Sequence, residues 1–252
     1  MGQGGSAEKF VFDKNVVVGR GNSGFVYKGS LADGTAVAVK VVPKSISAHH
    51  KGKVEAECEA LKLDHPNILR LLAMREDKDN YYLAMNYCAG GNLEDFIRDR
   101  GPLPEAVARK FLCDIVRGLL HMSDHNIIHR DIKPQNLLLS CASFDANIII
   151  GDLGTAKLLD LDRMARSSVG TMHYCAPEVL TAPSYDNKVD VWSIAITLYF
   201  MLTGKLPFNT SSMYTYLQSI LSGKFAVPEN RADISDELWG LLEKVSFSYY
   251  ST

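Results

Sequence analysis

The 252-residue sequence combines 46% hydrophobic with 22% charged residues, the balance of an ordinary globular protein. Its formal net charge is −2 and it has no block of lysines and arginines, so we exclude nucleic-acid binding as its main activity. The five cysteines are scattered without a Cys-x-x-Cys pair. This pattern argues against a disulfide framework or a zinc site and favours a reducing, cytoplasmic location.

The amino terminus is a glycine-rich leader. It begins Met1-Gly2-Gln3-Gly4-Gly5-Ser6, which fits the acceptor pattern for N-myristoylation on Gly2. An unmodified flexible leader is the simpler alternative. One acyl chain binds membranes only marginally, so we expect membrane contact only if Gly2 is acylated. The longest apolar stretch, Val189 to Leu202, is too short to span a bilayer.

The first expected elements are two strands joined by a glycine turn. Residues 10–18 are β-prone and run into Gly19-Arg20-Gly21-Asn22-Ser23-Gly24. In a dinucleotide-binding fold a helix would open after the third glycine, but residues 25–29 continue as a strand. A strand, glycine turn and strand allow backbone N–H groups to approach a phosphate closely.

The next expected strand carries a lysine inside an apolar run. Asp33-Gly34 is a strong hairpin signal that returns the chain into Ala36–Val42. Lys40 interrupts this run, and an isolated lysine in such a place is most often an edge-strand charge. Two more strands are expected over residues 68–74 and 81–85. From residue 93 the periodicity becomes helical, over residues 93–99 and 104–125.

The most informative stretch is His129-Arg130-Asp131-Ile132-Lys133-Pro134-Gln135-Asn136. It places a carboxylate (Asp131), a cation (Lys133) and an amide (Asn136) close together, the groups needed to orient a hydroxyl, neutralise a phosphate and hold a metal. A second metal-seeking carboxylate, Asp152, follows a strand-like segment. The octet resembles the His-Arg-Asp-x-x-x-x-Asn motif of the protein kinases, and its lysine resembles the serine/threonine branch.

The resemblance implies an α+β, bilobal protein-kinase fold, with a small β-rich N-lobe that carries one main helix and a larger, mostly helical C-lobe that ends early. The implied parts are a flexible leader at 1–9, an N-lobe at 10–85, a hinge at 86–92 and a C-lobe at 93–252. The implied reaction transfers the γ-phosphoryl of ATP to serine or threonine hydroxyls of a protein substrate. Asp131 would accept or orient the hydroxyl proton, Lys133 would stabilise the transferring phosphoryl, and Asn136 and Asp152 would hold Mg²⁺.

The resemblance also implies a nucleotide site. The turn from Gly19 to Gly24 would cover the phosphates, Lys40 would bind the α- and β-phosphates, and Met85 would limit the back of the adenine pocket. The other residues implied to contact ATP are Val26 and Ala38 above the adenine ring, Leu138 below it, the backbone of Asn86 and Cys88 beside it, and Asn92 near the ribose.

Lys40 should pair with a glutamate of the helix expected over residues 51–63. Glu55, Glu57 and Glu59 compete for this role. We choose Glu57, because that register places apolar neighbours on the inward face, whereas the register of Glu55 would turn charged residues inward.

A regulatory loop is implied over residues 155–169. Arg130, beside the catalytic aspartate, suggests control by phosphorylation, since a phosphate from the loop would neutralise it. Ser167 stands four residues before Thr171, the usual position of that phosphate, and Ser168 is the second choice. Ordinary loop serines are the simpler alternative. Phosphorylation there would imply an upstream kinase or regulatory partner.

The carboxy-terminal end departs from the family pattern. After Val245 the family expects an Asp-Pro-x-x-Arg motif and another helix, whereas this chain reads Ser246 to Thr252. The missing arginine normally pairs with the glutamate at Glu178. A buried carboxylate without its partner costs about 3–5 kcal/mol. This favours an alternative function, a catalytically impaired kinase-fold scaffold or regulatory isoform.

The subfamily signals are mixed. Residues 87–93 and 133–140 are similar to the autophagy-initiating kinases, whereas Asp152-Leu153-Gly154 and the context of Ser167 are similar to the IκB kinases. We favour the autophagy-initiating group. Gln135 stands where many arginine-directed kinases carry glutamate, so we expect no strict demand for basic residues just before the target.

Overall fold

The computed structural model describes residues 9–21, 24–44, 58, 61–153, 171–181, 188–221 and 225–248. Several predicted sites lie outside these described residues. They are Gly2, Asn22, Ser23, Glu57 with its competitors Glu55 and Glu59, Ser167 and Ser168.

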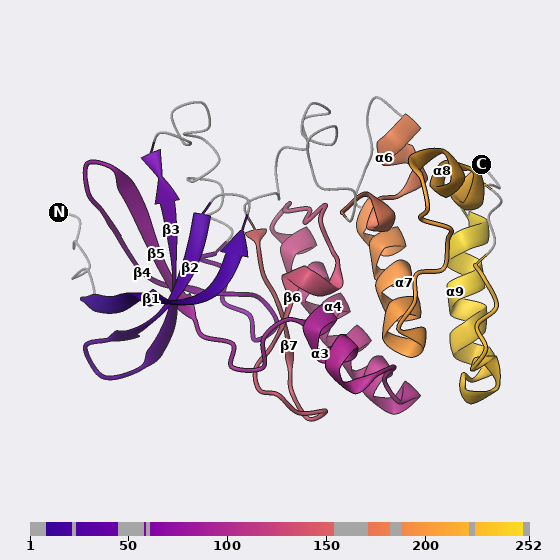
Figure 1. The fold of residues 1–252 in the computed structure, drawn as a ribbon, viewed down its shortest axis with the longest axis horizontal. Helices are drawn as coiled ribbons and strands as arrows, with labels where there is room; N and C mark the ends of the chain where they lie inside the picture. Colours follow the sequence, from indigo (N-terminus) through magenta and orange to yellow (C-terminus); the bar gives the residue numbers. More distant parts are fainter. Residues whose placement is uncertain are drawn as a thin grey trace.

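The amino-terminal lobe is an antiparallel sheet with the strand order β1-β2-β3-β5-β4. Its strands are β1 (Phe10–Gly21), β2 (Gly24–Leu31), β3 (Ala36–Pro43), β4 (Leu71–Glu76) and β5 (Asn80–Asn86). The predicted hairpin between β2 and β3 turns at Gly34, whose φ of 88° suits glycine. The sheet lies at one end of the molecule and the helices at the other (Figure 1).

The two faces of this sheet have different roles because side chains alternate along each strand. Val37 and Val39 of β3 pack with Phe10 and Tyr82 in a small core confined to the sheet. Lys40, between these positions and Val42, points to the opposite face, where Val42 joins the main core of the molecule. The apolar strand therefore presents its lysine toward the helical lobe, and Lys40 is not an exposed edge charge.

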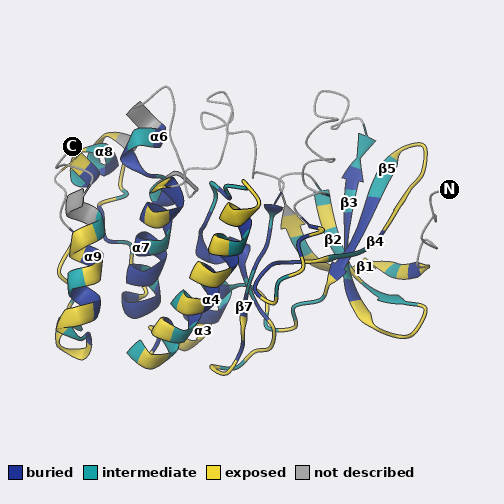
Figure 2. Cartoon of the chain, turned by 180° about the vertical axis from the view of Figure 1, so that it is seen from behind, coloured by how far each residue is buried: buried dark blue, intermediate teal, exposed yellow. Residues whose placement is uncertain are grey.

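The second lobe is mainly helical. Its helices are α3 (Leu93–Arg100), α4 (Glu105–Asp124), α6 (Pro177–Thr181), α7 (Lys188–Thr203), α8 (Met213–Leu221) and α9 (Asp236–Ser248). The apolar helix α7 lies between α4 and α9, and burial covers most of its surface (Figure 2). Inside it Trp192 is fully buried and stacks on Phe208 at a centroid distance of 5.8 Å. The long apolar stretch is thus the centre of this lobe.

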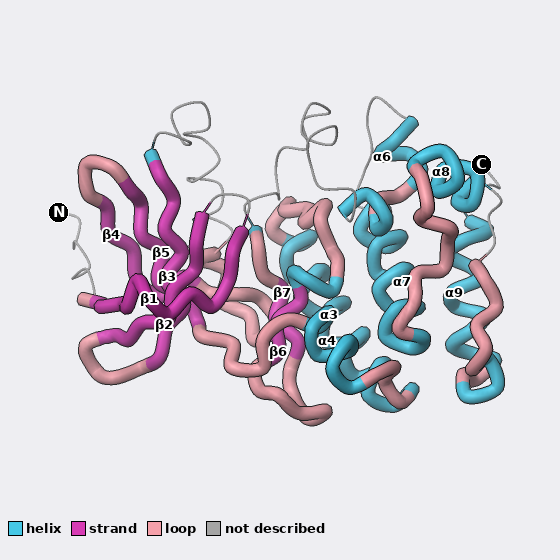
Figure 3. The backbone as a smooth tube through the Cα atoms, in the orientation of Figure 1, coloured by secondary structure: helices cyan, strands magenta, loops and turns pink. Residues whose placement is uncertain are grey.

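A short two-stranded sheet joins the lobes. It pairs β6 (Leu137–Leu139) with β7 (Ile148–Ile150), between the large sheet and the helices (Figure 3). Ile150 bonds through its backbone to Asn67 and Leu69, while the backbone N–H of Gly90 donates to the carbonyl oxygen of Leu139 at 3.0 Å. These bonds fix the segments around the predicted hinge to the segment that carries the catalytic motifs.

The observed elements confirm the predicted α+β, bilobal fold. The expected strand over 68–74 begins only at Leu71, because Ile68 forms a bridge with Ile150 of β7 instead of joining the large sheet. The helix expected over 51–63 falls largely outside the described residues. In the part of the chain that is described, no helix combines the length and the apolar character needed to cross a bilayer.

Candidate active site

The carboxylate of Asp131 is held by two neighbours from its own loop. Lys133 Nζ donates to both of its oxygens, at 3.0 and 2.7 Å, and Asn136 Nδ2 donates to Oδ2 at 2.9 Å. Asn136 Nδ2 also donates to the backbone oxygen of Asp131 at 2.8 Å. The three predicted catalytic side chains therefore form one connected group in a fixed orientation.

The loop bends sharply to achieve this. Lys133 precedes a 3-10 turn, η1 (Pro134–Asn136), in which proline supplies the first helical position without leaving an N–H unpaired. The backbone of Arg130 lies in the left-handed region, with φ of 67°. Such a conformation costs a bulky residue of order 1–3 kcal/mol and persists only where its surroundings enforce it.

The enforcing group is Asp190, at the start of α7. Its carboxylate accepts hydrogen bonds from the backbone N–H groups of His129 at 3.0 Å and Arg130 at 2.8 Å. His129 is fully buried, and its Nε2 lies 2.9 Å from the carbonyl oxygen of Gly151. Asp190 therefore fixes the backbone of the catalytic loop to the start of α7.

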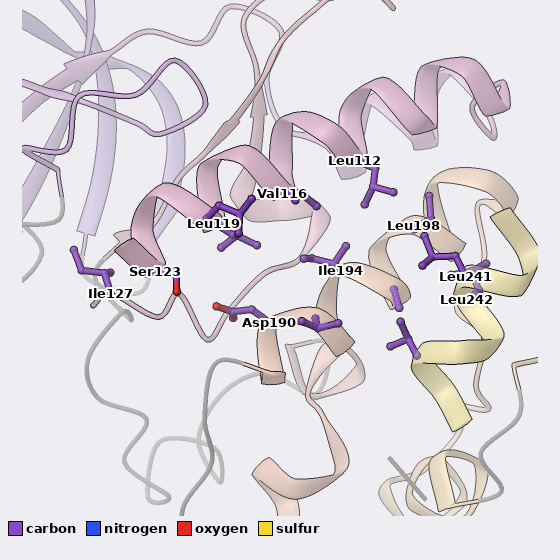
Figure 4. Close-up of a pocket in the computed structure, with 14 residues that line it drawn as sticks. Leu112, Val116, Leu119, Ser123, Ile127, Asp190, Ile194, Leu198, Leu241 and Leu242 are labelled. Carbon is purple, nitrogen blue, oxygen red and sulfur yellow. The ribbon is translucent and has the colours of Figure 1, made fainter. Parts of the chain in front are cut away.

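Asp190 also reaches one end of an apolar pocket between α4, α7 and α9 (Figure 4). This pocket has a volume of about 330 Å³ and is lined almost entirely by aliphatic side chains, such as Leu119, Ile194 and Leu241. Burial raises the pKa of Asp190, while the charge of His129 and the two backbone N–H groups oppose that shift. Because these surroundings are apolar, the hydrogen bonds from the loop to Asp190 are electrostatically stronger than they would be in water.

Asp152 lies on the other side of the site and faces Lys40. Lys40 Nζ is 3.6 Å from Asp152 Oδ1, and the two side chains are 6% and 26% exposed. The backbone of Asp152 has a φ of 50°, and the preceding Gly151 donates its N–H to the carbonyl oxygen of Asn136 at 2.8 Å. This bond brings the two predicted metal ligands, Asn136 and Asp152, onto adjacent segments.

The donor set of these two residues fits Mg²⁺, which prefers carboxylate and carbonyl oxygens. The side-chain nitrogen of Asn136 donates to Asp131. Its side-chain oxygen accepts no hydrogen bond among the described residues and is available to a metal. No group of three or more histidine, cysteine, aspartate or glutamate side chains able to hold a metal ion occurs in the described ranges. A metal here would therefore need further oxygen ligands, which nucleotide phosphates supply.

The predicted nucleotide residues share one face of the large sheet. Val26 lies opposite Lys40 in the register of β2 and β3, and Ala38 lies opposite Met85 in that of β3 and β5. Residues directly opposite one another in a sheet project from the same face. Val26, Ala38, Lys40 and Met85 therefore line the face that points toward the helical lobe.

Three predicted nucleotide contacts come from the hinge and β6. Cys88 accepts at its carbonyl oxygen from the Gly91 N–H at 3.3 Å, and its own N–H has no partner among the described residues. Burial raises the pKa of the Cys88 thiol to about 11, so this side chain stays protonated at neutral pH. The Asn86 N–H donates to the carbonyl oxygen of Arg70 at 3.3 Å. Leu138 is half-buried in β6.

Two predicted residues have structural tasks that the sequence did not reveal. A Cβ on Gly24 would lie 1.9 Å from the carbonyl oxygen of Val41, so glycine is needed there for strand packing. Asn92 caps α3, since its side-chain oxygen accepts from the Asp95 N–H at 2.9 Å and its amide donates to the Asp95 carboxylate at 2.8 Å. The predicted phosphate-covering residues Gly19, Arg20 and Gly21 lie at the end of β1. The contacts of all these residues with a nucleotide stay predictions.

One pair at the edge of the site was missed by the sequence analysis. Glu94, in the first turn of α3, accepts a hydrogen bond from the side-chain amide of Gln135, 41 residues later. Burial raises the pKa of Glu94, as does the neighbouring Asp95. An acidic residue in the first turn of a helix is explained by its favourable interaction with the helix dipole. The sequence therefore gave no sign that Glu94 also contacts Gln135.

The carboxylate of Glu178, in α6, has one buried oxygen without a hydrogen-bond partner in the described part of the chain. This agrees with the expectation from the missing Asp-Pro-x-x-Arg motif. Glu178 is half-buried as a whole.

Comparison with known proteins assigns this site to a family. The protein kinase domain family matches residues 12–247, nearly the whole described chain. The chain therefore belongs to the protein kinase domain family.

Individual relatives narrow the assignment. The chain is 36% identical over 232 residues to serine/threonine-protein kinase ATG1b of Arabidopsis thaliana, covering 90% of this chain and 33% of that protein. It is 35% identical over 229 residues to a probable serine/threonine-protein kinase of Dictyostelium discoideum, covering 88% and 27%. The predicted resemblance to serine/threonine kinases of the autophagy-initiating type is confirmed, and the chain spans about a third of the length of the first relative.

Proposed function

We propose that this chain transfers the γ-phosphoryl group of ATP to serine or threonine hydroxyls of protein substrates. The observation that carries the proposal is the carboxylate of Asp131, held by Lys133 and Asn136. The segment of Asp152, which pairs with Lys40, is joined to this loop by the hydrogen bond from the Gly151 N–H to the Asn136 carbonyl oxygen. The names of the relatives as serine/threonine-protein kinases support the same reaction.

Each side chain has a definite task in this reaction. Asp131 orients the acceptor hydroxyl and takes its proton as the oxygen attacks phosphorus. Lys133, already beside that carboxylate, neutralises the oxygens of the phosphoryl group in transit. Lys40 positions the α- and β-phosphates, and Asn136 and Asp152 would hold Mg²⁺, which supplies positive charge to the phosphates when bound. The fixed loop geometry favours this alignment before the substrate arrives.

The regulation and location of the protein are parts of the proposal. Phosphorylation of Ser167, or of Ser168, by an upstream kinase would supply a phosphate that neutralises the charge of Arg130, and it would raise activity. The protein would act in cytoplasmic signalling, and it would contact membranes only when Gly2 carries a myristoyl group. Mass spectrometry of protein expressed in its own cells tests both modifications.

The test of the reaction is transfer from radiolabelled ATP with Mg²⁺ to the chain itself and to a generic serine/threonine substrate. We expect Asp131→Asn and Asp152→Ala to lower the rate by at least about 10²-fold. Asp99→Asn, which removes a charge from the exposed side of α3, is the matched control and should leave the rate unchanged. Equal rates in all four proteins would contradict the assigned roles.

A second candidate function is a kinase-fold scaffold with little catalysis. The buried oxygen of Glu178 that has no partner among the described residues favours it, because a less stable C-lobe would misplace the catalytic loop. A folded sample that binds ATP, measured by calorimetry, but transfers no phosphate would support the scaffold. Transfer that depends on Asp131 would exclude it.

A further inference from the structure

Three histidines form a continuous stack where the loop before β4 meets the end of α4. The His65 ring lies 4.9 Å from the ring of His121, with 24° between the two planes, and the His121 ring lies 4.6 Å from that of His125. His65 belongs to the loop that leads into the large sheet, whereas His121 lies in the last turn of α4 and His125 is its C-cap. The stack therefore joins the two lobes through side chains that can change their charge.

A backbone donor sets the protonation state of His65. The Asn67 N–H donates to His65 Nδ1 at 3.1 Å, so this nitrogen carries no proton and the ring is neutral. The single proton of such a ring sits on Nε2, and a second proton has to bind Nδ1. Protonation of His65 therefore removes the acceptor and sets one N–H group against another.

His125 has no such conflict. Its Nδ1 lies 2.8 Å from the carbonyl oxygen of His121, which can only accept, so this nitrogen carries a proton in both the neutral and the charged ring. Charging His125 thus breaks no hydrogen bond. Of these two rings, only that of His65 has a bond that depends on its being neutral.

The surroundings of His65 oppose a positive charge on it. Burial lowers the pKa of the His65 imidazole, and the charges of His121 and Arg117 lower it further. Histidine ordinarily changes its charge near pH 6.5, where two stacked rings that are both charged repel each other. The neutral ring is therefore the form that fits the folded chain.

The carboxylates near the stack are engaged with other groups. Asp114 accepts from a backbone N–H of β7 at 3.0 Å and lies 3.6 Å from Arg117 Nη1. Asp64 pairs with Arg70 at 3.2 Å on the surface. Among the described residues, no carboxylate forms an ion pair with any of the three rings. The other charged side chains close to the rings in sequence are Lys62 and Asp124, both exposed.

Asn67 connects the stack to the catalytic segment. Its side-chain amide donates to the carbonyl oxygen of Ile148 at 2.8 Å, and its own carbonyl oxygen accepts from the Ile150 N–H at 2.9 Å. A Cβ on Gly118 of α4 would lie 3.0 Å from that same carbonyl oxygen, so helix, loop and β7 are in direct contact. Asp152 stands two residues after Ile150, so the position of Asn67 affects the position of this carboxylate.

We propose that His65 is a pH-sensitive contact between the lobes, whose neutral ring holds Asn67 and β7 against α4 and whose protonation loosens them and lowers phosphate transfer. The part that concerns phosphate transfer rests on the proposed kinase function. Because the folded chain disfavours the charged ring, the unfolded chain binds the proton first as the pH falls. The contact therefore contributes its full stability above the unfolded value of about 6.5 and loses it progressively below that value.

The first test is the Tm of wild type and His65→Asn between pH 7.5 and pH 5.5. Asparagine offers a side-chain oxygen that accepts an N–H two residues on, and it does not titrate. We expect the Tm of the wild type to fall by about 2–4 °C more than that of His65→Asn, the shift that one hydrogen bond produces in a domain of this size. His125→Asn is the matched control, because it removes an imidazole whose charging breaks no bond, and it should keep the wild-type pH dependence. Equal falls in wild type and His65→Asn would overturn the proposal.

The second test is the rate of phosphate transfer over the same pH range. We expect kcat/KM for ATP to fall by about 2–10-fold more in the wild type than in His65→Asn, the factor that corresponds to one hydrogen bond. The other titrating groups of the active site are the same in both proteins and cancel in this comparison. A fall of equal size in both would overturn the coupling between His65 and the catalytic segment.

Nuclear magnetic resonance separates this proposal from the proposed reaction. Spectra of ¹⁵N-labelled histidine rings report the protonation of each nitrogen without any phosphate transfer. We expect His65 of the wild type to carry its proton on Nε2 at pH 7.5. A proton on Nδ1 at that pH would overturn the proposal even in an active kinase, whereas the expected ring state together with the Tm difference, in a chain that transfers no phosphate, would support the contact and contradict the kinase function alone.

Discussion

Asp190 accepts the backbone N–H of Arg130 at 2.8 Å, across sixty residues of sequence, while Arg130 holds a φ of 67°. The carboxylate belongs to α7, in which most residues are buried, and the strained residue belongs to the catalytic loop. Because the same carboxylate also accepts the N–H of His129, it fixes two successive peptide units. The rigid centre of the C-lobe thereby sets the position of Asp131, which follows Arg130 directly.

Asp190→Asn tests this relationship. Asparagine keeps one acceptor oxygen but turns an amide toward the second N–H, so we expect a loss of about 1–3 kcal/mol in the free energy of unfolding. The rate should fall more in kcat than in KM, since the loop would be misplaced while the nucleotide face of the sheet is untouched. Urea denaturation and steady-state kinetics give both numbers. The control is Glu229→Gln, because the Glu229 side chain is 91% exposed, and it should change the free energy of unfolding by less than about 0.5 kcal/mol. A similar loss of stability in both variants would refute the role of Asp190.

Only some parts of the site can be predicted from the sequence. The catalytic octet and Asp152 each belong to a local motif with its own chemical signature, and their mutual distances follow once the fold is known. The pair of Glu94 and Gln135 has no such signature, because it depends on how the first turn of α3 docks onto η1. The sequence can name side chains, whereas packing decides which of them meet.

The same limit applies to elements of the fold. The apolar stretch after residue 188 predicts α7 well, because a helix that is buried on all sides needs apolar residues throughout. The strand expected from Ile68 begins instead at Leu71, since an apolar residue of this kind pairs equally well with β7. Asn92 stays a predicted ribose contact, and its side chain in addition caps α3, a role that only the backbone geometry reveals.

Two glycines should respond in opposite ways to alanine. A Cβ on Gly90 would lie 2.3 Å from the Cys141 carbonyl oxygen and 2.6 Å from Leu139 Cβ, so Gly90→Ala must push β6 away from the hinge segment. We expect a loss of about 1–3 kcal/mol in unfolding free energy and a higher KM for ATP. Gly240 lies inside α9 with nothing within 4 Å, so Gly240→Ala should gain about 0.5–1 kcal/mol. Thermal and urea unfolding measure both, and equal signs would show that the hinge segment is not tightly packed.

Glu105 makes the stability of the C-lobe depend on pH. Its carboxylate accepts from the Ser235 N–H at 2.7 Å, the Ser235 hydroxyl at 2.8 Å and Arg109 Nε at 2.7 Å, joining α4 to the start of α9. The hydrogen bond from the Ser235 backbone is the main cause that lowers the pKa of Glu105. A lowered folded-state pKa gives stability that is present above the unfolded value of about 4.3 and is lost as the pH falls through the folded value.

The measurement is the Tm of wild type and Glu105→Gln from pH 7 down to pH 3. We expect the wild type to be more stable at pH 7 and the difference to shrink below about pH 4.3. Carboxylates elsewhere, such as Asp33 and Asp77, also have lowered pKa values, but they titrate in both proteins and cancel in the comparison. A Tm difference that stays constant with pH would show that Glu105 acts through packing and not through its charge.

Asn136→Asp tests how the amide divides its two functions. In the wild type its nitrogen donates to Asp131, which leaves the oxygen available for a metal. Aspartate would remove both donated hydrogen bonds and set a second carboxylate against Asp131, so without a cation we expect a loss of about 1–3 kcal/mol in stability.

Mg²⁺ with ATP should recover most of that loss, because two carboxylates bind a divalent cation more tightly than one carboxylate and an amide. Thermal unfolding with and without Mg²⁺ and ATP measures the recovery. The control is Asn209→Asp, at an exposed asparagine whose side-chain oxygen accepts from the Ser211 N–H. A loss in Asn136→Asp that Mg²⁺ does not reverse would show that this position serves the loop alone and does not reach the metal.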